Sequence, residues 1–249
     1  MSMTLSDRTC VITGASRGIG RGIAEQLGAE GANVVVNYHY SSEAANRVAD
    51  VIEDMGGSAI ACQADVTDRE QVDRMRDETH EAFGRPAVLV NNAGITQDTK
   101  FETMTREEWD RVIDVTLGGT FNCTQTFFPD IKHAEEGRLV NISSVIGKQG
   151  NYGQANYAAA KSGLFGLTRS LALELAPHGA TANCVAPGYT ETDMVEGVRD
   201  DILDRLKEQI PLKRFASVEE IACVVRFLAS EEASYISGEV LDVNGAMDL

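Results

Sequence analysis

Short apolar runs alternate with longer amphipathic segments along the whole chain, and this alternation limits the possible folds more than any other feature. Runs rich in β-branched residues predict seven strands, at residues 9–13, 33–37, 58–65, 87–94, 137–144, 180–188 and 238–245. Helices are predicted to begin near residues 19, 42 and 68, and to cover residues 105 to about 132 and about 152–175. Strands separated by helices of this length form βαβ units, so the pattern predicts an α/β fold with a parallel sheet.

The organisation along the chain favours one domain. No repeat, linker or change of composition divides the 249 residues, and α/β domains often reach this length. Residues 191–215 leave the strand before them and return only at the next helix, so we expect an inserted helical lid over the substrate there.

The N-terminal residues hold no apolar run followed by a cleavage site, and no apolar stretch approaches the roughly 18 residues of a membrane span. We therefore expect a soluble, cytoplasmic protein with no membrane partner. Five widely spaced cysteines and four scattered histidines favour neither a disulfide framework nor a metal site. The cysteines are expected to be small buried hydrophobic residues.

The formal net charge of −16 disfavours binding to nucleic acid or to an anionic membrane surface. Only six of the 22 basic residues are lysine. An acidic surface poor in lysine fits a halophilic protein, because counterions at high salt screen the repulsion between like charges. An ordinary acidic cytosolic enzyme is the alternative. Stability measured against KCl separates the two, because only the halophilic protein loses its structure below molar salt.

A glycine-rich turn, TGASRGIG, joins the first predicted strand to the first predicted helix. Gly14, Gly18 and Gly20 allow the backbone to turn tightly and to approach a pyrophosphate without a Cβ clash. The helix N-terminus then offers free N–H groups to the phosphates. A turn of this kind also occurs in purely structural loops, but its place in a βαβ unit favours a dinucleotide site.

The end of the second strand indicates which dinucleotide. Enzymes selective for NAD usually carry an acidic residue there, which binds the ribose 2′-hydroxyl. Here Asn37, Tyr38 and Ser41 are neutral, and the first carboxylate is Glu43. Arg17, inside the glycine turn, can pair with a 2′-phosphate. The sequence therefore favours NADPH, with a solvated loop arginine as the alternative reading of Arg17.

Tyr157 and Lys161 lie one helical turn apart, so their side chains leave the same face of a predicted helix. A neighbouring ammonium is expected to lower the pKa of the phenol, which lets it exchange a proton with a substrate oxygen. Ser144 follows the fifth strand and can donate a hydrogen bond to the same oxygen. A Tyr/Lys pair alone is usually a helix surface, but Ser144 lies where parallel sheets bind their ligands.

Together these motifs resemble the short-chain dehydrogenase/reductase family. TGASRGIG, NNAG at 91–94, Ser144, Tyr157-x3-Lys161 and Pro187-Gly188 occur in the order and spacing of that family, over nearly the whole chain. The resemblance implies a Rossmann-type three-layer α/β/α domain with a seven-stranded parallel sheet, hydride transfer between a carbonyl and an alcohol, and a homotetramer. It also makes Tyr157 the general acid in reduction.

The resemblance further assigns roles by position. Lys161 lowers the pKa of Tyr157 and holds the nicotinamide ribose, and Ser144 orients the substrate carbonyl. Asp65 and Val66 flank the adenine of the cofactor. The segment PGYTET wraps the carboxamide of the nicotinamide. The complete set of expected cofactor residues is Gly14, Ser16, Arg17, Gly18, Ile19, Gly20, Asn37, Asp65, Val66, Asn91, Ala93, Gly94, Tyr157, Lys161, Pro187, Gly188, Thr190 and Thr192.

One position departs from the family pattern. In the segment VIDVTLGGTF, Thr116 takes the place of a catalytic asparagine that helps to hold a water linking the lysine to solvent. Either this relay is rebuilt through Thr116 and water, or turnover is impaired. We expect Thr116→Asn to keep or raise kcat, and a large loss would show that Thr116 has a role of its own.

The stretch after PGYTET resembles acetoacetyl-CoA reductases, which favours reduction of acetoacetyl-CoA to (R)-3-hydroxybutyryl-CoA, a precursor of polyhydroxybutyrate. Lys148, Lys213 and Arg214 are candidate contacts for the CoA phosphates, although each can equally be a solvated surface charge. A 3-oxoacyl-acyl-carrier-protein reductase is the first alternative, disfavoured by the acidic surface. A non-catalytic NADP(H)-binding sensor is the second, with Thr116 as its only support.

Overall fold

The computed structural model describes residues 5–191 and 199–248. Seven parallel strands form one sheet in the order β3-β2-β1-β4-β5-β6-β7. Their bounds are β1 Thr9–Ile12, β2 Asn33–Tyr38, β3 Ser58–Gln63, β4 Val88–Asn91, β5 Arg138–Ile142, β6 Thr181–Pro187 and β7 Val240–Val243. The predicted α/β fold of Rossmann type, with a seven-stranded parallel sheet, is confirmed.

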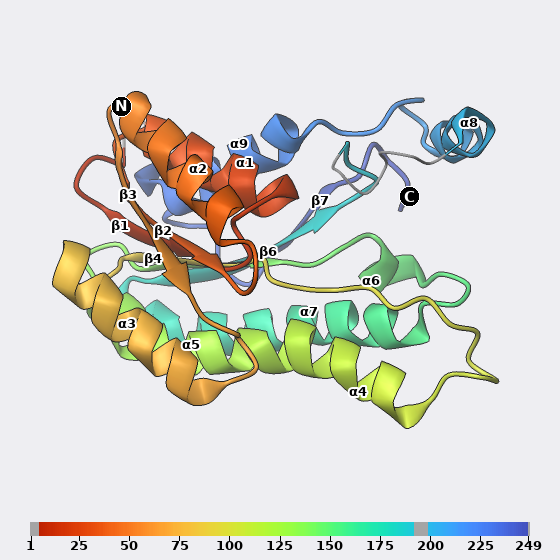
Figure 1. Cartoon of the computed structure of the whole chain (residues 1–249), viewed down its shortest axis with the longest axis horizontal. Helices are drawn as coiled ribbons and strands as arrows, with labels where there is room; N and C mark the ends of the chain where they lie inside the picture. The colour runs from red at the N-terminus through yellow and green to blue at the C-terminus, as the bar shows by residue number, and fades with distance from the viewer. Residues whose placement is uncertain (1–4, 192–198, 249) are drawn as a thin grey trace.

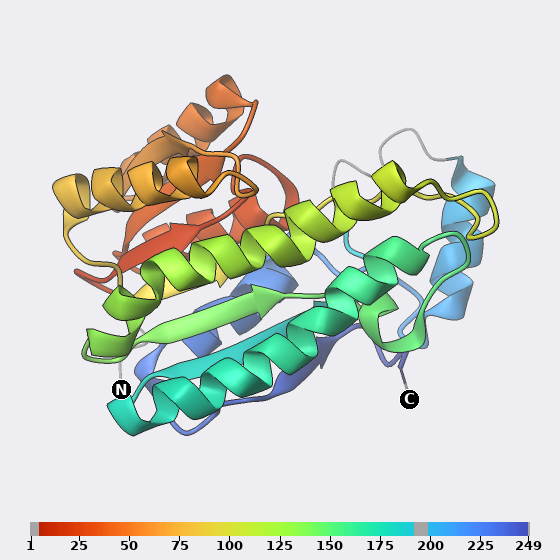
Figure 2. The ribbon, with the colours of Figure 1, turned by 90° about the horizontal axis from the view of Figure 1, so that it is seen from below.

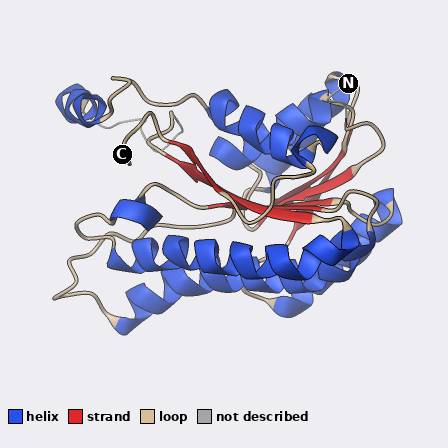
Figure 3. Cartoon of the chain, turned by 180° about the vertical axis from the view of Figure 1, so that it is seen from behind, coloured by secondary structure: helices blue, strands red, loops and turns tan. Residues whose placement is uncertain are grey.

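Helices cover both faces of this sheet (Figures 1 and 3). In Figure 1 the upper layer holds α1 Gly18–Ala29, α2 Ser42–Asp54 and α9 Val218–Ala229. The lower layer, seen from below in Figure 2, holds α3 Arg69–Phe83, α4 Arg106–Ile113, α5 Gly119–His133 and α7 Ala155–Leu175. The three-layer arrangement buries the sheet on both sides.

The alternation of side chains along each strand builds two separate cores. On β1, Cys10 and Ile12 pack with α1, α2 and α9, whereas Val11 between them packs with α3 and α5. Successive strand residues point to opposite faces, so a run that is apolar throughout supplies both cores at once. Four of the five cysteines are buried, as predicted, and Cys223 is exposed.

The strand order places a crevice beside β1. From β1 the chain winds outward through β2 and β3, and then returns to β4 on the other side of β1. The strand order therefore reverses between β1 and β4, and in open α/β sheets ligands bind at the carboxyl ends of the strands at such a reversal. The glycine turn follows β1, and NNAG includes the last residue of β4.

Two helices differ from the prediction. The helix expected at residues 105–132 is interrupted by a π-helical turn, Asp114–Gly118, between α4 and α5. The helix expected from about residue 152 begins at Ala155, after a separate short helix, α6 Ile146–Gln149. Gly150 and Gly153 have φ values of +73° and +76°, which end α6 and delay α7.

The described part of residues 191–215 contains a helix, α8 Asp200–Gln209, beyond the carboxyl end of the sheet (Figure 1). The two ends of this segment meet at its base, where Thr190 forms a parallel bridge with Ala216 and the Ala216 N–H donates to the Tyr189 carbonyl at 2.9 Å. Within residues 5–191 and 199–248, every helix is too short or too polar to cross a membrane.

Candidate active site

The glycine turn after β1 has the conformation that a phosphate cradle needs. Gly14 and Gly18 have φ values of +62° and +55°, which side chains rarely adopt. A Cβ on Gly14 would lie 3.0 Å from the Ala93 Cα, so the turn packs directly against NNAG. Ser16, Ile19 and Gly20 complete the turn into α1.

The N-terminus of α1 differs from those of α3, α4 and α9. Side chains of Asp68, Thr105 and Ser217 cap those three helices, and acidic residues occupy their first turns. The N-cap of α1 is Arg17, whose side chain makes no capping hydrogen bond, and the first turn of α1 has no acidic residue. Its free N–H groups and positive dipole end therefore suit an anionic ligand, and the turn fits a dinucleotide pyrophosphate.

Two residues that the sequence did not single out hold this turn in place. The Thr13 hydroxyl accepts hydrogen bonds from the Asn92 and Ala93 N–H groups, at 2.9 and 3.0 Å. The Asn92 side chain donates to the carbonyls of Thr13 and Gly14, at 3.0 and 3.1 Å. A Cβ on Gly20 would lie 2.4 Å from Asn92 Nδ2, so glycine is required there for a packing reason as well.

Asn37 and Asn91 are buried supports in this structure. Asn37 Oδ1 accepts from the Gly14 N–H at 3.1 Å, and its Nδ2 donates to the Ala64 carbonyl at 3.1 Å. Asn91 Nδ2 donates to Thr124 Oγ1 and Asn141 Oδ1, both at 2.9 Å. Their carboxamides shape the walls of the crevice by joining strands and helices.

Arg17 is exposed at the mouth of the crevice, and no side-chain ion pair or hydrogen bond engages it among the described residues. Near the end of β2, His39 stacks on Tyr40 at 3.6 Å between ring centroids and approaches Asp65 at 3.5 Å. His39 thus contacts a residue predicted to flank the adenine, and no local pattern indicates this contact because it joins the end of β2 to the loop after β3.

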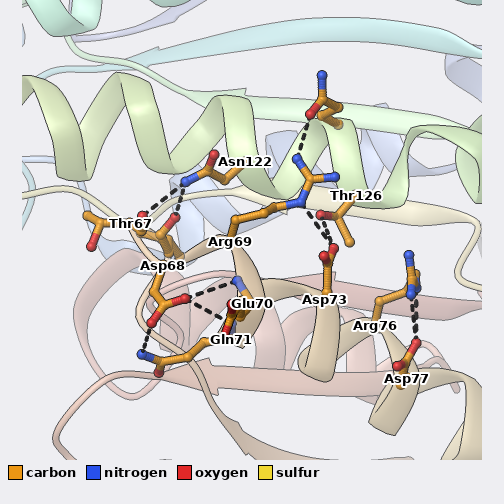
Figure 4. Close-up of polar contacts among 12 residues, drawn as sticks. Thr67, Asp68, Arg69, Glu70, Gln71, Asp73, Arg76, Asp77, Asn122 and Thr126 are labelled. Carbon is orange, nitrogen blue, oxygen red and sulfur yellow. Dashed lines mark hydrogen bonds and ion pairs between the residues drawn. The ribbon is translucent and has the colours of Figure 1, made fainter.

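The loop after β3, predicted to flank the adenine, is fixed by polar contacts with α3 and α5 (Figure 4). Asp65 Oδ1 accepts from the Thr67 N–H at 2.9 Å, and Asn122 on α5 donates to the Val66 carbonyl at 2.9 Å. Thr126 on α5 donates to Asp73 on α3 at 2.9 Å and so joins these two helices, and Arg69 donates to the same carboxylate at 3.1 Å from within α3 (Figure 4). These hydrogen bonds hold the loop in a defined shape.

Ser144 and Tyr157 come together as predicted, from the end of β5 and the first turn of α7. Both are half-buried, and the Ser144 hydroxyl lies close enough to the phenol to act on its pKa. Asn156, which the sequence did not single out, fixes the start of this helix. Its Oδ1 accepts from the Tyr157 N–H at 2.8 Å, and its Nδ2 donates to the Gln97 and Glu108 carbonyls.

The pKa of Tyr157 differs from the sequence expectation. Burial raises the pKa of the phenol, the hydrogen bond from Ser144 partly lowers it, and the Asp98 carboxylate raises it again. The Lys161 ammonium lies 5.6 Å from the ring centroid and does not reverse this direction. A phenol that keeps its proton at neutral pH is the form required of a general acid, so the arrangement suits reduction of a carbonyl.

Lys161 is buried, and its Nζ donates to the Ile142 carbonyl at 2.6 Å. Burial lowers the pKa of the ammonium to about 8, and the nearby Cys184 thiol raises it slightly. Its backbone is fixed as well, because Ser143 Oγ donates to the Lys161 carbonyl at 2.8 Å. Gly94 of NNAG lies between the ammonium and the π-helical turn, because a Cβ built on it would be 3.4 Å from Lys161 Nζ and 3.4 Å from Thr116 Oγ1.

Pro187 and Gly188 end β6 next to this group. The Val145 N–H donates to the Pro187 carbonyl at 2.8 Å, and a Cβ on Gly188 would lie 2.8 Å from the Asn244 Cα. Thr190 donates to the Gly188 carbonyl at 3.2 Å. Thr192, also predicted to contact the cofactor, lies outside the described residues.

A family model described as enoyl-(acyl carrier protein) reductase matches residues 14–247, nearly the whole chain. The chain belongs to the short-chain dehydrogenase/reductase family. This family consists of oxidoreductases, and the predicted resemblance is confirmed.

Curated relatives of this short-chain dehydrogenase/reductase match it over almost their full length. A 3-oxoacyl-[acyl-carrier-protein] reductase of Staphylococcus aureus is 48% identical over 247 residues, covering 99% of both chains. The enzyme of that name from Synechocystis sp. is 46% identical over 244 residues, covering 98% of both. A third, from Aquifex aeolicus, is 45% identical and covers 99% of this chain and 100% of its own length.

The three cations predicted to contact a CoA phosphate are already engaged in this family member. Lys148 pairs with Asp242 and with Asp248, at 2.5 and 3.3 Å. Arg214 makes two 2.6 Å hydrogen bonds to Glu220. Lys213 donates to the Glu208 carbonyl at 2.7 Å. A cation paired with a carboxylate attracts a phosphate weakly, so the structure gives no support to the contacts expected of Lys148 and Arg214. Lys213 keeps its charge, because a backbone carbonyl does not neutralise it.

Proposed function

We propose that this chain is an NADPH-dependent 3-oxoacyl-thioester reductase and that its acyl group is carried by an acyl carrier protein. The observation that carries the proposal is the identity of 45–48% with reductases of that name over at least 98% of this chain, together with the meeting of Ser144, Tyr157 and Lys161. The family model has a description that refers to enoyl groups, but these near full-length relatives are the more specific guide.

The chemistry follows from the three side chains. NADPH, when bound in the crevice, supplies the hydride that the substrate carbonyl carbon accepts. Ser144 donates a hydrogen bond to the carbonyl oxygen and stabilises the negative charge that develops there. Tyr157 transfers its phenolic proton to that oxygen, and the product is a 3-hydroxyacyl thioester. The Lys161 ammonium then stabilises the phenolate through its charge.

The carrier-protein substrate replaces acetoacetyl-CoA as our first choice. The relatives are named for the carrier-protein thioester, and two of the three cations invoked for CoA are paired with carboxylates within the chain. The net charge of −16 still opposes contact with an acidic carrier protein. Salt screens this repulsion, and the screening length is about 8–10 Å near physiological ionic strength and shorter at higher salt. We therefore expect the contact to strengthen as the salt concentration rises.

A substrate panel tests the proposal. NADPH oxidation is followed with acetoacetyl-CoA, longer 3-oxoacyl-CoAs and an acetoacetyl carrier protein, each at low and at molar KCl. We expect kcat/KM for the carrier-protein thioester at molar KCl to exceed that for acetoacetyl-CoA by about tenfold, which corresponds to about 1.4 kcal/mol of transition-state stabilisation. Preference for acetoacetyl-CoA at both salt concentrations would restore the CoA alternative, and inactivity with every thioester would favour the sensor.

Arg17 is proposed to select NADPH over NADH. Arg17→Ala removes a guanidinium that no other described residue engages, and we expect kcat/KM for NADPH to fall by about 10- to 100-fold, the value of a charge-assisted hydrogen bond. The value for NADH should stay nearly constant. Arg21→Ala is the matched control, because Arg21 lies one turn further along α1 and pairs with Glu25 at 3.2 Å. Equal losses with both cofactors would refute the assignment.

We also propose a cytoplasmic homotetramer that depends on salt. The exposed fractions of Phe121 on α5 and Leu173 on α7 are 50% and 78%, and such apolar side chains on neighbouring helices favour contact between subunits. The acidic composition supports the salt requirement. Sedimentation measured against KCl concentration tests both proposals.

A further inference from the structure

The loop between β4 and α4 is attached to the start of α7. The Thr99 N–H donates to the Gly153 carbonyl at 2.8 Å, and Asn156 Nδ2 donates to the Gln97 carbonyl at 3.1 Å. These hydrogen bonds engage the residues on either side of Asp98, which therefore lies beside the first turn of α7. The backbone thus sets the position of Asp98, although its side chain is exposed.

A side chain from the same end of α7 orients the Asp98 carboxylate. Gln154, the N-cap of α7, donates through Nε2 to both carboxylate oxygens, at 2.9 and 3.0 Å. Gln154 is held in turn, because its Oε1 accepts from Asn151 Nδ2 at 2.9 Å. This chain of hydrogen bonds keeps an exposed carboxylate in one orientation.

The partner of Asp98 is an amide, which leaves the negative charge of the carboxylate in place. Within residues 5–191 and 199–248, no lysine, arginine or histidine forms an ion pair with Asp98. The nearby Asp110 on α4 differs, because it pairs with Arg106 at 2.7 Å. An amide donates hydrogen bonds but carries no charge, so it does not neutralise a carboxylate as a guanidinium does. Asp98 therefore adds net negative charge at the start of α7.

This charge acts on the phenol of Tyr157. Burial raises the pKa of Tyr157, and the Asp98 carboxylate raises it as well, because a nearby negative charge opposes formation of the phenolate. In the proposed function the substrate oxygen receives its proton from this phenol. A charge that a substrate carries close to its carbonyl group therefore also lies in the field of Asp98.

A 3-oxoacyl thioester and the corresponding free acid differ in this respect. Both have a ketone and, beyond one methylene, a second carbonyl carbon. In the thioester that second group is uncharged, whereas in the free acid it is a carboxylate. A fixed negative charge beside the proton donor consequently disfavours the acid and leaves the thioester nearly unaffected.

We propose that Asp98, held by Gln154, is a specificity-determining residue that favours uncharged 3-oxoacyl esters and thioesters over free 3-oxo acids. The discrimination comes from repulsion of the acid's carboxylate, so it needs no added contact with the favoured substrate. The inference rests on the proposed function, because it concerns substrate selection at that same site.

Methyl acetoacetate and acetoacetate test this proposal, because they are similar in size and differ in charge. Their kcat/KM values with NADPH are compared for the wild-type chain and for Asp98→Asn, which keeps the shape and one acceptor oxygen for Gln154 and removes the charge. We expect kcat/KM for acetoacetate to rise by about tenfold in Asp98→Asn and that for methyl acetoacetate to change by less than about twofold.

Two further variants control the experiment. Asp110→Asn removes a carboxylate that Arg106 already neutralises, so the ratio of the two kcat/KM values should equal that of the wild type. Gln154→Ala keeps the charge of Asp98 and removes the group that orients it, so it should give only part of the gain with acetoacetate. An unchanged ratio in Asp98→Asn together with a lowered Tm would show that the carboxylate only stabilises the N-terminus of α7, and would overturn the proposal.

Salt supplies a second measurement that a purely structural role would not affect. The screening length falls to about 3 Å at molar ionic strength, so repulsion between Asp98 and acetoacetate should weaken as KCl is raised. The preference of the wild-type chain for the ester should decrease accordingly, and the preference of Asp98→Asn should stay nearly constant. The same salt dependence in both chains would count against Asp98.

The inference and the proposed function can fail separately. If the wild-type chain reduces 3-oxoacyl thioesters and Asp98→Asn leaves the ester-to-acid ratio unchanged, the function stands and the role of Asp98 is refuted. If no thioester or ester is reduced, the proposed function fails, and saturation-transfer NMR with NADPH present decides the inference. Acetoacetate should then bind Asp98→Asn about tenfold more tightly than the wild-type chain, and equal affinities would refute the role of Asp98.

Discussion

Tyr157→Phe is expected to lower kcat for 3-oxoacyl reduction by about 10³-fold, because the variant keeps the ring and loses the proton that the substrate oxygen must receive. The binding of NADPH should change little, since the glycine turn and Lys161 remain in place. Stopped-flow or steady-state measurement of NADPH oxidation gives kcat, and fluorescence of the bound cofactor gives its affinity.

Tyr152→Phe is the matched control for this variant. Tyr152 lies five residues before Tyr157, is 81% exposed and makes no side-chain hydrogen bond among the described residues. Removal of the Tyr152 hydroxyl should leave kcat at the wild-type value. If Tyr157→Phe retained more than about a tenth of wild-type kcat, the phenol could not be the principal proton donor.

The pH profile of kcat is expected to fall above about pH 8. Burial lowers the pKa of Lys161 to about 8, so the ammonium is present below this pH and is lost as the pH rises through it. Tyr157 has a raised pKa and keeps its proton over the same range. Each pH unit above the pKa removes about nine tenths of the remaining ammonium, so kcat should approach a tenfold fall per unit.

The measurement is kcat at saturating NADPH and substrate in buffers on both sides of pH 8, compared with Lys132→Met as a control. Lys132 lies near the end of α5 and contacts none of the three catalytic side chains, so its loss should leave the profile unchanged. A kcat that stays level well beyond pH 9 would show that turnover does not require a charged Lys161.

The strands and their parallel pairing could be predicted because each strand carries its own signal. The run VVV at residues 34–36 is apolar at every position, and both faces of β2 are buried. The glycine turn and the Tyr157–Lys161 pair were likewise local patterns in the sequence. Their meeting with Ser144 followed from the rule that parallel strands bring their carboxyl ends to one edge of the sheet.

The site features that could not be predicted depend on contacts between residues that are far apart in the sequence. The hydrogen bonds of Asn37 could not be predicted, because the pairing of β2 with β3 brings its carboxamide onto the Ala64 carbonyl. Asn92 and Asn156 were missed because their partners, Gly14 and Glu108, lie 78 and 48 residues away. The π-helical turn at Thr116 has no composition signal, since it changes which carbonyls are paired and leaves the residues helical.

The expected direction of the Tyr157 pKa failed for a similar reason. The sequence showed the ammonium one turn away but not the burial of the phenol or the carboxylate of Asp98, which lies 59 residues earlier in the chain. Desolvation of the phenolate outweighs an ammonium at the distance found here.

The central claim is that Tyr157 completes the reduction of a 3-oxoacyl thioester by protonating its oxygen. The most direct test is to quantify NADPH oxidised and 3-hydroxyacyl thioester formed in the same reaction, for the wild-type chain and for Tyr157→Phe. With the wild type, the amount of NADPH oxidised should equal the amount of 3-hydroxyacyl thioester formed. With Tyr157→Phe, neither NADPH oxidation nor product formation should rise above background. NADPH loss without the hydroxy product, or equal product from both chains, would contradict it.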